Sequence, residues 1–185
     1  MSSADSGKRL TEKVSAEIDE EIHLCPYNPQ WITLFSAEHD RLRCLFAPGT
    51  PIEHIGSTSV PGLLAKPIID IMVGVGEEAT PSQRQQLVSA GYEDLGESGV
   101  PGRLYFRRRG VHSFNVHVVR FDGPIWKTNL ALRNYLRADS KARDHYAAAK
   151  RGALEAGCTT LLRYSDHKSS TVKLLIASAL QHPSA

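Results

Sequence analysis

Apolar residues in the first half of the chain recur with two different periods, and each period predicts a different kind of element. Between residues 29 and 46 they recur at steps of three and four, which is typical of one face of a helix that begins at Pro29. Two shorter runs, 51–55 and 67–75, are rich in Ile and Val and predict buried strands that lie side by side. Alternation of polar and apolar residues at 21–25 predicts one more short strand.

In the second half, the pattern changes from strands to helices. A helix opens at Thr80-Pro81 and closes at Gly91. Three further strands are then predicted at 92–95, 103–108 and 113–119. Three helices are predicted after them at 125–138, 140–156 and 165–181. Ser140 is the expected cap of the middle one. The sequence therefore predicts an α+β fold, with a mixed β-sheet flanked by helices and a helical C-terminal third.

Composition narrows the class of protein. With 185 residues, 41% of them hydrophobic, the chain can form one domain with a sizeable core, expected at 20–181 after a disordered N-terminal arm at 1–19. The formal net charge of +2 indicates no strong nucleic-acid partner, and no apolar run reaches the roughly 18 residues of a membrane span. Three scattered cysteines favour reduced thiols. We therefore expect a cytoplasmic protein with no membrane segment.

Candidate chemistry concentrates in a glycine loop that precedes the second buried strand. Gly56 lets a ligand approach the backbone closely, and it is followed by three successive hydroxyl residues, Ser57, Thr58 and Ser59. Such a loop can surround an anion with N–H donors. The alternative is a rigid connection whose hydroxyl groups only satisfy their own backbone. The loop is therefore a candidate phosphate site.

Asp70 lies inside the apolar run 67–75, where a buried carboxylate needs a partner. That partner could be a metal ion or the nearby Lys66; the alternative is a structural acid bonded to backbone N–H groups. Asn115 and His117 are two residues apart on a predicted strand, so they share a face. They could supply metal or phosphate contacts beside Asp70, or they could be a polar pair on an exposed face of the sheet.

The stretch around this loop resembles a known family. Ile-Gly-Ser at 55–57, followed by the strand with Asp70, is similar to the signature of the nucleotidyltransferase superfamily, and segments 54–63 and 65–71 are more closely similar to the GrpB (UPF0157) family within it. Further matching segments lie at 27–31, 100–106, 115–119, 132–136 and 164–168. The resemblance implies a nucleotidyltransferase-like sheet flanked by helices.

The resemblance also implies a function. It implies a protein that binds a nucleotide or another phosphorylated small molecule. It also implies transfer of a nucleoside monophosphate to an unknown acceptor, with Asp70 as the catalytic residue. Mg²⁺ or Mn²⁺ would be held by Asp70 and His117. Active members carry a second carboxylate two residues after the first, where this chain has Met72, which is a poor ligand for a hard cation. The alternative is a non-catalytic metabolite-binding or accessory module, linked to coenzyme A metabolism because GrpB-like domains also occur joined to dephospho-coenzyme A kinase domains.

Cationic side chains complete the candidate site. Arg103 lies within a family-like segment and could neutralise phosphate, whereas the neighbouring run 107–109 is predicted to be a solvated edge. Lys168 lies one helical turn after Tyr164, and both match the family pattern; a long cation there could reach a phosphate. The alternative for Lys168 is an ordinary surface lysine.

Overall fold

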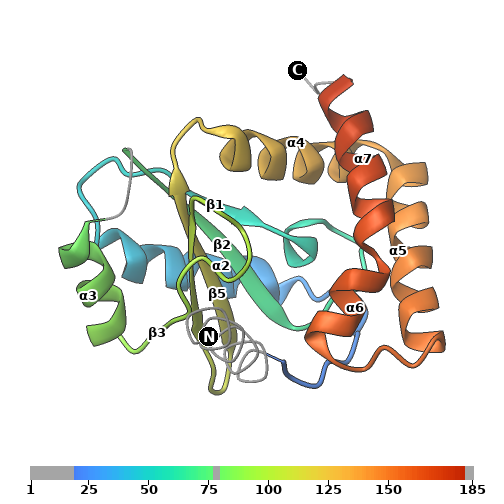
Figure 1. Ribbon diagram of the computed structural model, residues 1–185, viewed down its shortest axis with the longest axis horizontal. Coiled ribbons are helices and arrows are strands. Elements are labelled where there is room, and N and C mark those ends of the chain that lie inside the picture. Colours follow the sequence, from blue (N-terminus) through green and yellow to red (C-terminus); the bar gives the residue numbers. More distant parts are fainter. Residues whose placement is uncertain (1–18, 77–79, 182–185) are drawn as a thin grey trace, which may run out of the picture.

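The computed structural model describes residues 19–76 and 80–181, and it contains a five-stranded sheet and six α-helices within those residues (Figure 1). The strands are β1 (Ile52–Ile55), β2 (Ile68–Val75), β3 (Glu93–Asp94), β4 (Arg103–Arg108) and β5 (Ser113–Arg120). The helices are α2 (Gln30–Arg43), α3 (Pro81–Ser89), α4 (Pro124–Ala138), α5 (Ser140–Glu155), α6 (Leu161–His167) and α7 (Ser169–Gln181). A short 3-10 turn, η1 (Ser57–Ser59), follows β1.

The sheet is mixed, with the strand order β1-β2-β5-β4-β3. Its central pair, β2 and β5, is parallel, and the outer pairs are antiparallel. The predicted neighbours β1 and β2 are paired, and β4 and β5 form the predicted hairpin around Gly110. The predicted α+β fold with a mixed sheet and a helical C-terminal third is confirmed.

The register of β2 against β5 gives the sheet two chemically different faces. Ile69, Ile71 and Val73 lie opposite Phe114, Val116 and Val118, and these side chains form the main core with Trp31 and Leu42 of α2 and Leu87 of α3. On the other face, Asp70 lies opposite Asn115 and Met72 opposite His117. Because side chains alternate along a strand, one face of these two strands is apolar and the other carries the candidate site.

The C-terminal helices lie on the polar side of the sheet. In Figure 1, α4 crosses the top of the molecule in gold, α5, α6 and α7 lie at the right in orange and red, and α3 lies at the left in green. Helix α4 contacts β1 and β5 and is packed against α5 and α7. Between α4 and the sheet, a smaller apolar cluster contains Ile55, Met72, Val119 and Trp126. These helices therefore cover the polar face and enclose the space next to Asp70.

Three local predictions were wrong. Residues 21–25 form two isolated bridges, Glu21 to Thr160 and Cys25 to Ala65, because this segment pairs with two different loops and not along one strand. The cap of α5 is Asp139, whose carboxylate accepts from the N–H of Ala142, and not Ser140. The last predicted helix is divided at Lys168 into α6 and α7.

The N-terminal arm lies mostly outside the described residues. Asp19, its last predicted residue, is described, and its carboxylate accepts a hydrogen bond of 2.9 Å from the N–H of Leu162 at the start of α6. The extent of the single domain stays a prediction. Among residues 19–76 and 80–181, no helix is both long and apolar enough to cross a bilayer.

Candidate functional site

A pocket of about 440 Å³ opens between the polar face of the sheet and helices α4 to α7. All of the residues predicted for the site except Ser59 line it: Gly56, Ser57, Thr58, Lys66, Asp70, Arg103, Asn115, His117, Tyr164 and Lys168. They come from the glycine loop with η1, the segment before β2, three strands, α6 and the α6–α7 junction, so residues separated by more than 100 positions meet here. We call this space the site pocket.

Asp70 is held by polar side chains on the neighbouring strand. Its Oδ1 accepts a hydrogen bond of 2.7 Å from Asn115 Nδ2 and lies 3.5 Å from His117 Nε2. Burial alone would raise the pKa of this carboxyl group, but His117, the charge of Lys66 and the amide of Asn115 together lower it to about 2. Among the described residues, Lys66 forms no ion pair with Asp70 within 4 Å. Asp70 is therefore an ionised acceptor at neutral pH, 28% exposed towards the pocket.

Arg109 fixes which end of the Asn115 amide faces Asp70. It donates to Asn115 Oδ1 at 3.0 Å and to Phe114 O, and it forms a two-point ion pair with Glu20 at 2.7 and 3.0 Å. With its oxygen bound to Arg109, Asn115 presents its N–H group to Asp70. The prediction of a solvated edge at 107–109 was wrong, since the three arginines pair with Glu93, Glu38 and Glu20 in turn.

Gly56 is required by the close approach of the loop to Asp70. Its φ is +69°, in the left-handed region, and a Cβ built there would lie 2.9 Å from Asp70 Cβ and still closer to Asp70 Oδ2. The loop therefore brings its backbone directly against the carboxylate.

The three hydroxyl groups after Gly56 have different partners. Ser59 Oγ donates to Gly56 O at 2.6 Å inside the turn, and Ser59 lines a separate groove next to His54. Thr58 Oγ1 is buried and bonded to His54 Nε2 at 3.0 Å. Ser57 Oγ accepts from Lys150 Nζ at 2.6 Å, so its own O–H remains available as a donor to the pocket. Ser59 therefore only satisfies the backbone of its own loop, as the alternative interpretation stated. Ser57 is the residue whose hydroxyl group is suited to contact a ligand.

His54 supports the glycine loop through its hydrogen bond with Thr58, and its ring is neutral at neutral pH because its pKa is lowered. It is 6% exposed, and its ring stacks on Phe35 with centroids 4.7 Å apart. Desolvation by burial, with the charges of Arg137 and Arg133, lowers the pKa of His54 to about 4 in spite of the opposing effect of Asp70.

We predict acid sensitivity from this histidine. His54 takes up a proton near pH 6.5 in the unfolded state but only near pH 4 in the folded state. The free energy of unfolding is therefore unaffected by this residue above pH 6.5 and decreases as the pH falls below it; at pH 5 the loss is about 2 kcal/mol. Urea unfolding at pH 7.5 and pH 5 should show this loss in the wild type and its near absence in His54→Gln. His112→Gln, at an exposed position, should behave as the wild type. Equal losses in all three proteins would contradict the assignment.

Lys150 is a pocket residue that the sequence analysis missed. It is only 2% exposed, and its Nζ donates to Ser57 Oγ and, at 2.8 Å, to Leu64 O. Burial disfavours its charged form and, with the nearby charges of Lys168 and Lys66, lowers its pKa well below the usual value. A signal was present in the sequence, because Lys150 lies on the buried stripe of α5 with Ala142, Tyr146 and Ala153.

Two tyrosine rings hold three lysines together, which we call the lysine cluster: Lys66, Lys150 and Lys168. Lys150 Nζ lies 4.4 Å and Lys168 Nζ 5.6 Å from the centroid of the Tyr146 ring. Lys168 Nζ and Lys66 Nζ lie 5.3 and 5.9 Å from that of Tyr164. Burial lowers the pKa of Lys66 to about 8, although Asp70 opposes the shift. The cluster thus concentrates ammonium groups in a partly dry space.

Arg103 forms the opposite wall of the site pocket. Its guanidinium donates to Glu97 O and Ser98 O at 3.1 and 2.9 Å, lies 3.5 Å from His117 Nδ1, and stacks over Tyr105 at 4.9 Å. Its Nε is buried without a partner among the described residues. Arg103 therefore keeps unused hydrogen-bonding capacity beside the site.

Comparison with known proteins identifies the family. The model of the GrpB protein family matches residues 21–178, which is most of the chain. This chain belongs to the GrpB family. The UPF0157 protein SCO7215 of Streptomyces coelicolor is 34% identical over 173 residues, covering 90% of this chain and 91% of that protein. The UPF0157 protein YqkA of Bacillus subtilis is 34% identical over 155 residues, but this chain spans only 45% of its length.

Solved structures agree with this assignment. The crystal structure of the conserved protein GrpB from Enterococcus faecalis matches with a TM-score of 0.75 and 32% identity, covering 86% of this chain and 98% of that one. The Cid1 poly(U) polymerase with MgGTP bound matches with a TM-score of 0.45 and 16% identity over 80% of this chain and 50% of that one. A nucleotidyltransferase is thus among the similar structures, at a score that supports no conclusion about substrate or activity.

The donor set of this GrpB-family site does not complete a metal centre. Among the described residues, Asp70 is the one carboxylate that lines the pocket, and its Oδ1 already accepts from Asn115. Met72, where a second carboxylate would lie, is fully buried in the apolar cluster under α4. Within the described residues, no group of three or more His, Cys, Asp or Glu side chains could hold an ion. Mg²⁺ prefers six oxygen ligands, which these residues do not supply.

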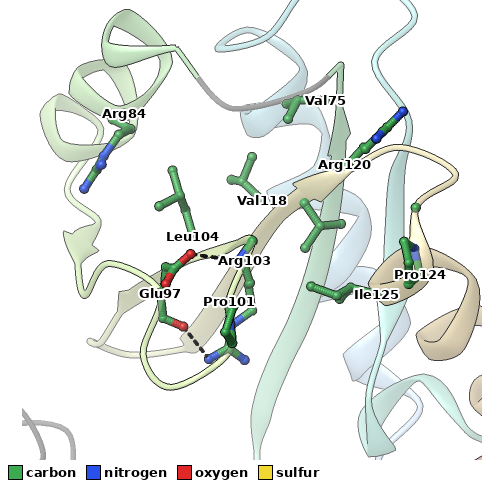
Figure 2. Close-up of a pocket in the computed structure, with 13 residues that line it drawn as sticks. Val75, Arg84, Glu97, Pro101, Arg103, Leu104, Val118, Arg120, Pro124 and Ile125 are labelled. Carbon is green, nitrogen blue, oxygen red and sulfur yellow. Dashed lines mark hydrogen bonds between the residues drawn. The ribbon is translucent and has the colours of Figure 1, made fainter.

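A second and larger pocket, of about 580 Å³, lies beside the site pocket (Figure 2). Figure 2 shows Arg103 and Glu97 at one end of it and Arg84 and Arg120 at the periphery. Of the residues predicted for the site, it contains only Arg103, which lines both pockets. The larger of these two pockets is therefore not the one that contains most of the predicted site residues.

Proposed function

We propose that this protein binds a nucleotide or another phosphorylated small molecule in the site pocket. The observation that carries the proposal is Lys150: a buried lysine whose Nζ donates to Ser57 and has no carboxylate partner within 4 Å among the described residues. A buried cation without a counter-charge is costly, and a phosphate group would supply that charge through short, charge-assisted hydrogen bonds. Three free cysteines support the proposed cytoplasmic location.

Binding can be tested by thermal unfolding with a panel of phosphorylated compounds. The panel contains pyrophosphate, nucleoside triphosphates and monophosphates, and coenzyme A with its precursors. A compound at about 100 times its dissociation constant should add about 2.7 kcal/mol of stability, which raises the midpoint by about 5–10 °C for a chain of this size. Absence of any shift across the panel, with and without Mg²⁺ or Mn²⁺, would refute the proposal.

The lysine that carries the proposal has a matched control on its own helix. We predict that Lys150→Met weakens binding of the active compound about 10- to 100-fold, because one buried charge-assisted hydrogen bond is lost while the volume of the side chain is kept. Lys141→Met, at an exposed position of α5, should bind as the wild type. Circular dichroism confirms that both variants are folded. Equal affinities of the two variants would place the phosphate elsewhere.

Transfer of a nucleoside monophosphate to an acceptor is the second candidate activity. It is favoured by Asp70, an ionised carboxylate in contact with the glycine loop. The coordination of a metal would have to be completed by oxygens of the nucleotide and water, since the part of the chain that the structure describes offers one carboxylate to the pocket. Products that form only with Mg²⁺ or Mn²⁺ and disappear in Asp70→Asn would support transfer. Binding without turnover would support the metabolite-binding or accessory module, and the coenzyme A compounds test its proposed metabolic link.

A further inference from the structure

The charged side chains that line the site pocket are mostly cationic, and this imbalance bears on how the charge of a bound phosphate would be neutralised. Of the described residues that line it, Asp70 is the one that is acidic, whereas four have cationic side chains: Lys66, Arg103, Lys150 and Lys168. None of these four forms an ion pair within 4 Å among the described residues. The pocket therefore carries a surplus of positive charge when it is empty.

The donors of the lysine cluster converge next to the glycine loop. Lys150 Nζ and Ser57 Oγ are 2.6 Å apart, and Lys168 Nζ lies 3.3 Å from Tyr146 OH. In its ammonium form a lysine has three N–H donors, so the two hydrogen bonds of Lys150 would leave one more for an oxyanion that favours this form. Lys150 and Lys168 thus lie at the same Tyr146 ring, and each ammonium group can bind an oxyanion as a point charge.

On the other side of the pocket, Asp70 is not arranged as a metal ligand in a multi-carboxylate centre. One of its oxygens is bonded to Asn115, whose orientation is fixed by Arg109, and its neighbour two residues on is the apolar Met72. An ionised carboxylate of this kind can still accept a hydrogen bond from a ligand hydroxyl or amino group. The two halves of the pocket therefore suit opposite ends of one ligand.

We propose that the lysine cluster takes the place of a divalent cation, so that a phosphorylated ligand binds metal-free with its phosphate on Lys150, Lys168 and Ser57 and a hydroxyl or amino group on Asp70. This inference rests on the proposed function and specifies the ligand class. A bound dianion would supply the counter-charge that these lysines lack and would favour their ammonium forms.

Isothermal titration of the full chain with pyrophosphate distinguishes the two ways of neutralising a phosphate. Titrations are made in excess EDTA and in excess Mg²⁺. The proposal predicts equal or tighter binding in EDTA, since Mg²⁺ competes for the anion. Lys168→Met should weaken binding about 10- to 100-fold, and Lys173→Met, at an exposed position of α7, should leave it unchanged.

Asp70→Asn gives the sharpest contrast. Pyrophosphate has no donor group for Asp70, so removal of the negative charge should leave its affinity unchanged or raise it several-fold. Binding that requires Mg²⁺ and is lost in Asp70→Asn would overturn metal-free binding but keep the proposed function. No heat from pyrophosphate, and no shift from any compound of the panel under either condition, would instead overturn the proposed function itself. Circular dichroism of Asp70→Asn and Lys168→Met excludes misfolding as the cause.

Discussion

Gly56→Ala is expected to destabilise the protein by about 2–5 kcal/mol, combining about 1–2 for a left-handed backbone with about 1–3 for overpacking. The backbone of Gly56 has a φ of +69°, and an added Cβ would lie 2.9 Å from Asp70 Cβ. Asp70 cannot move away freely, because Asn115 holds its Oδ1. The loop or the strand must therefore shift, and pyrophosphate binding should weaken as Ser57 moves with it.

Gly62→Ala is the matched control, and urea unfolding of both variants measures the difference. Gly62 has a φ of +79°, but a Cβ there would meet no heavy atom within 4 Å. It should cost only the backbone strain, about 1–2 kcal/mol. If both variants lose the same stability, the approach of the loop to Asp70 carries no constraint of its own.

Much of the fold can be read from the sequence because hydrophobic burial determines it. The apolar run of β2 predicted a buried strand, and the alternation along β5 placed Asn115 and His117 on one face. Pairing of β2 with β5 then brings Asp70 opposite Asn115, as the candidate site required. The division at Lys168 was not predicted, because α6 and α7 have nearly continuous helical spacing; the break helps place that lysine against Tyr146.

The parts of the site that escaped prediction depend on contacts between distant segments. Nothing local to Arg109 shows that Glu20 will hold it or that it will orient Asn115. Lys150 resembles any helical lysine until its position on the buried stripe of α5 is noticed. Ser59 differs from Ser57 only in the direction that η1 gives each hydroxyl group. Composition and spacing therefore locate a candidate phosphate loop, but tertiary packing decides which donors it presents.

Met72→Asp is expected to destabilise the protein by about 3–5 kcal/mol at neutral pH, as an uncompensated buried charge does. Met72 is fully buried, and its neighbours Ile55, Val119 and Trp126 are apolar. Gly74, on the same face of β2, lets Trp126 pack directly on the sheet, since a Cβ there would lie 2.9 Å from the indole. This packing closes the space in which a second carboxylate and its hydration would have to fit.

The pH dependence of the loss identifies its cause. Burial raises the pKa of the introduced carboxyl group above its unfolded value, so the destabilisation should be largest at neutral pH and should shrink as the pH falls towards 5. Met72→Leu keeps the volume and polarity of the site and should cost less than about 1.5 kcal/mol at both pH values. Urea unfolding of both variants, each compared with the wild type at the same pH, removes the contribution of His54.

Unfolding of Met72→Asp with and without Mg²⁺ also tests how the site pocket neutralises the charge of a phosphate. If packing under α4 excludes a metal, Mg²⁺ should leave the unfolding midpoint of Met72→Asp unchanged, and pyrophosphate should still bind in EDTA through the lysine cluster. A Mg²⁺-dependent rise of several degrees, absent in the double variant with Asp70→Asn, would show that the two carboxylates close on a cation. In that case Met72 would be the residue that prevents the rest of the pocket from binding a metal ion, and the lysine cluster alone would not account for phosphate binding.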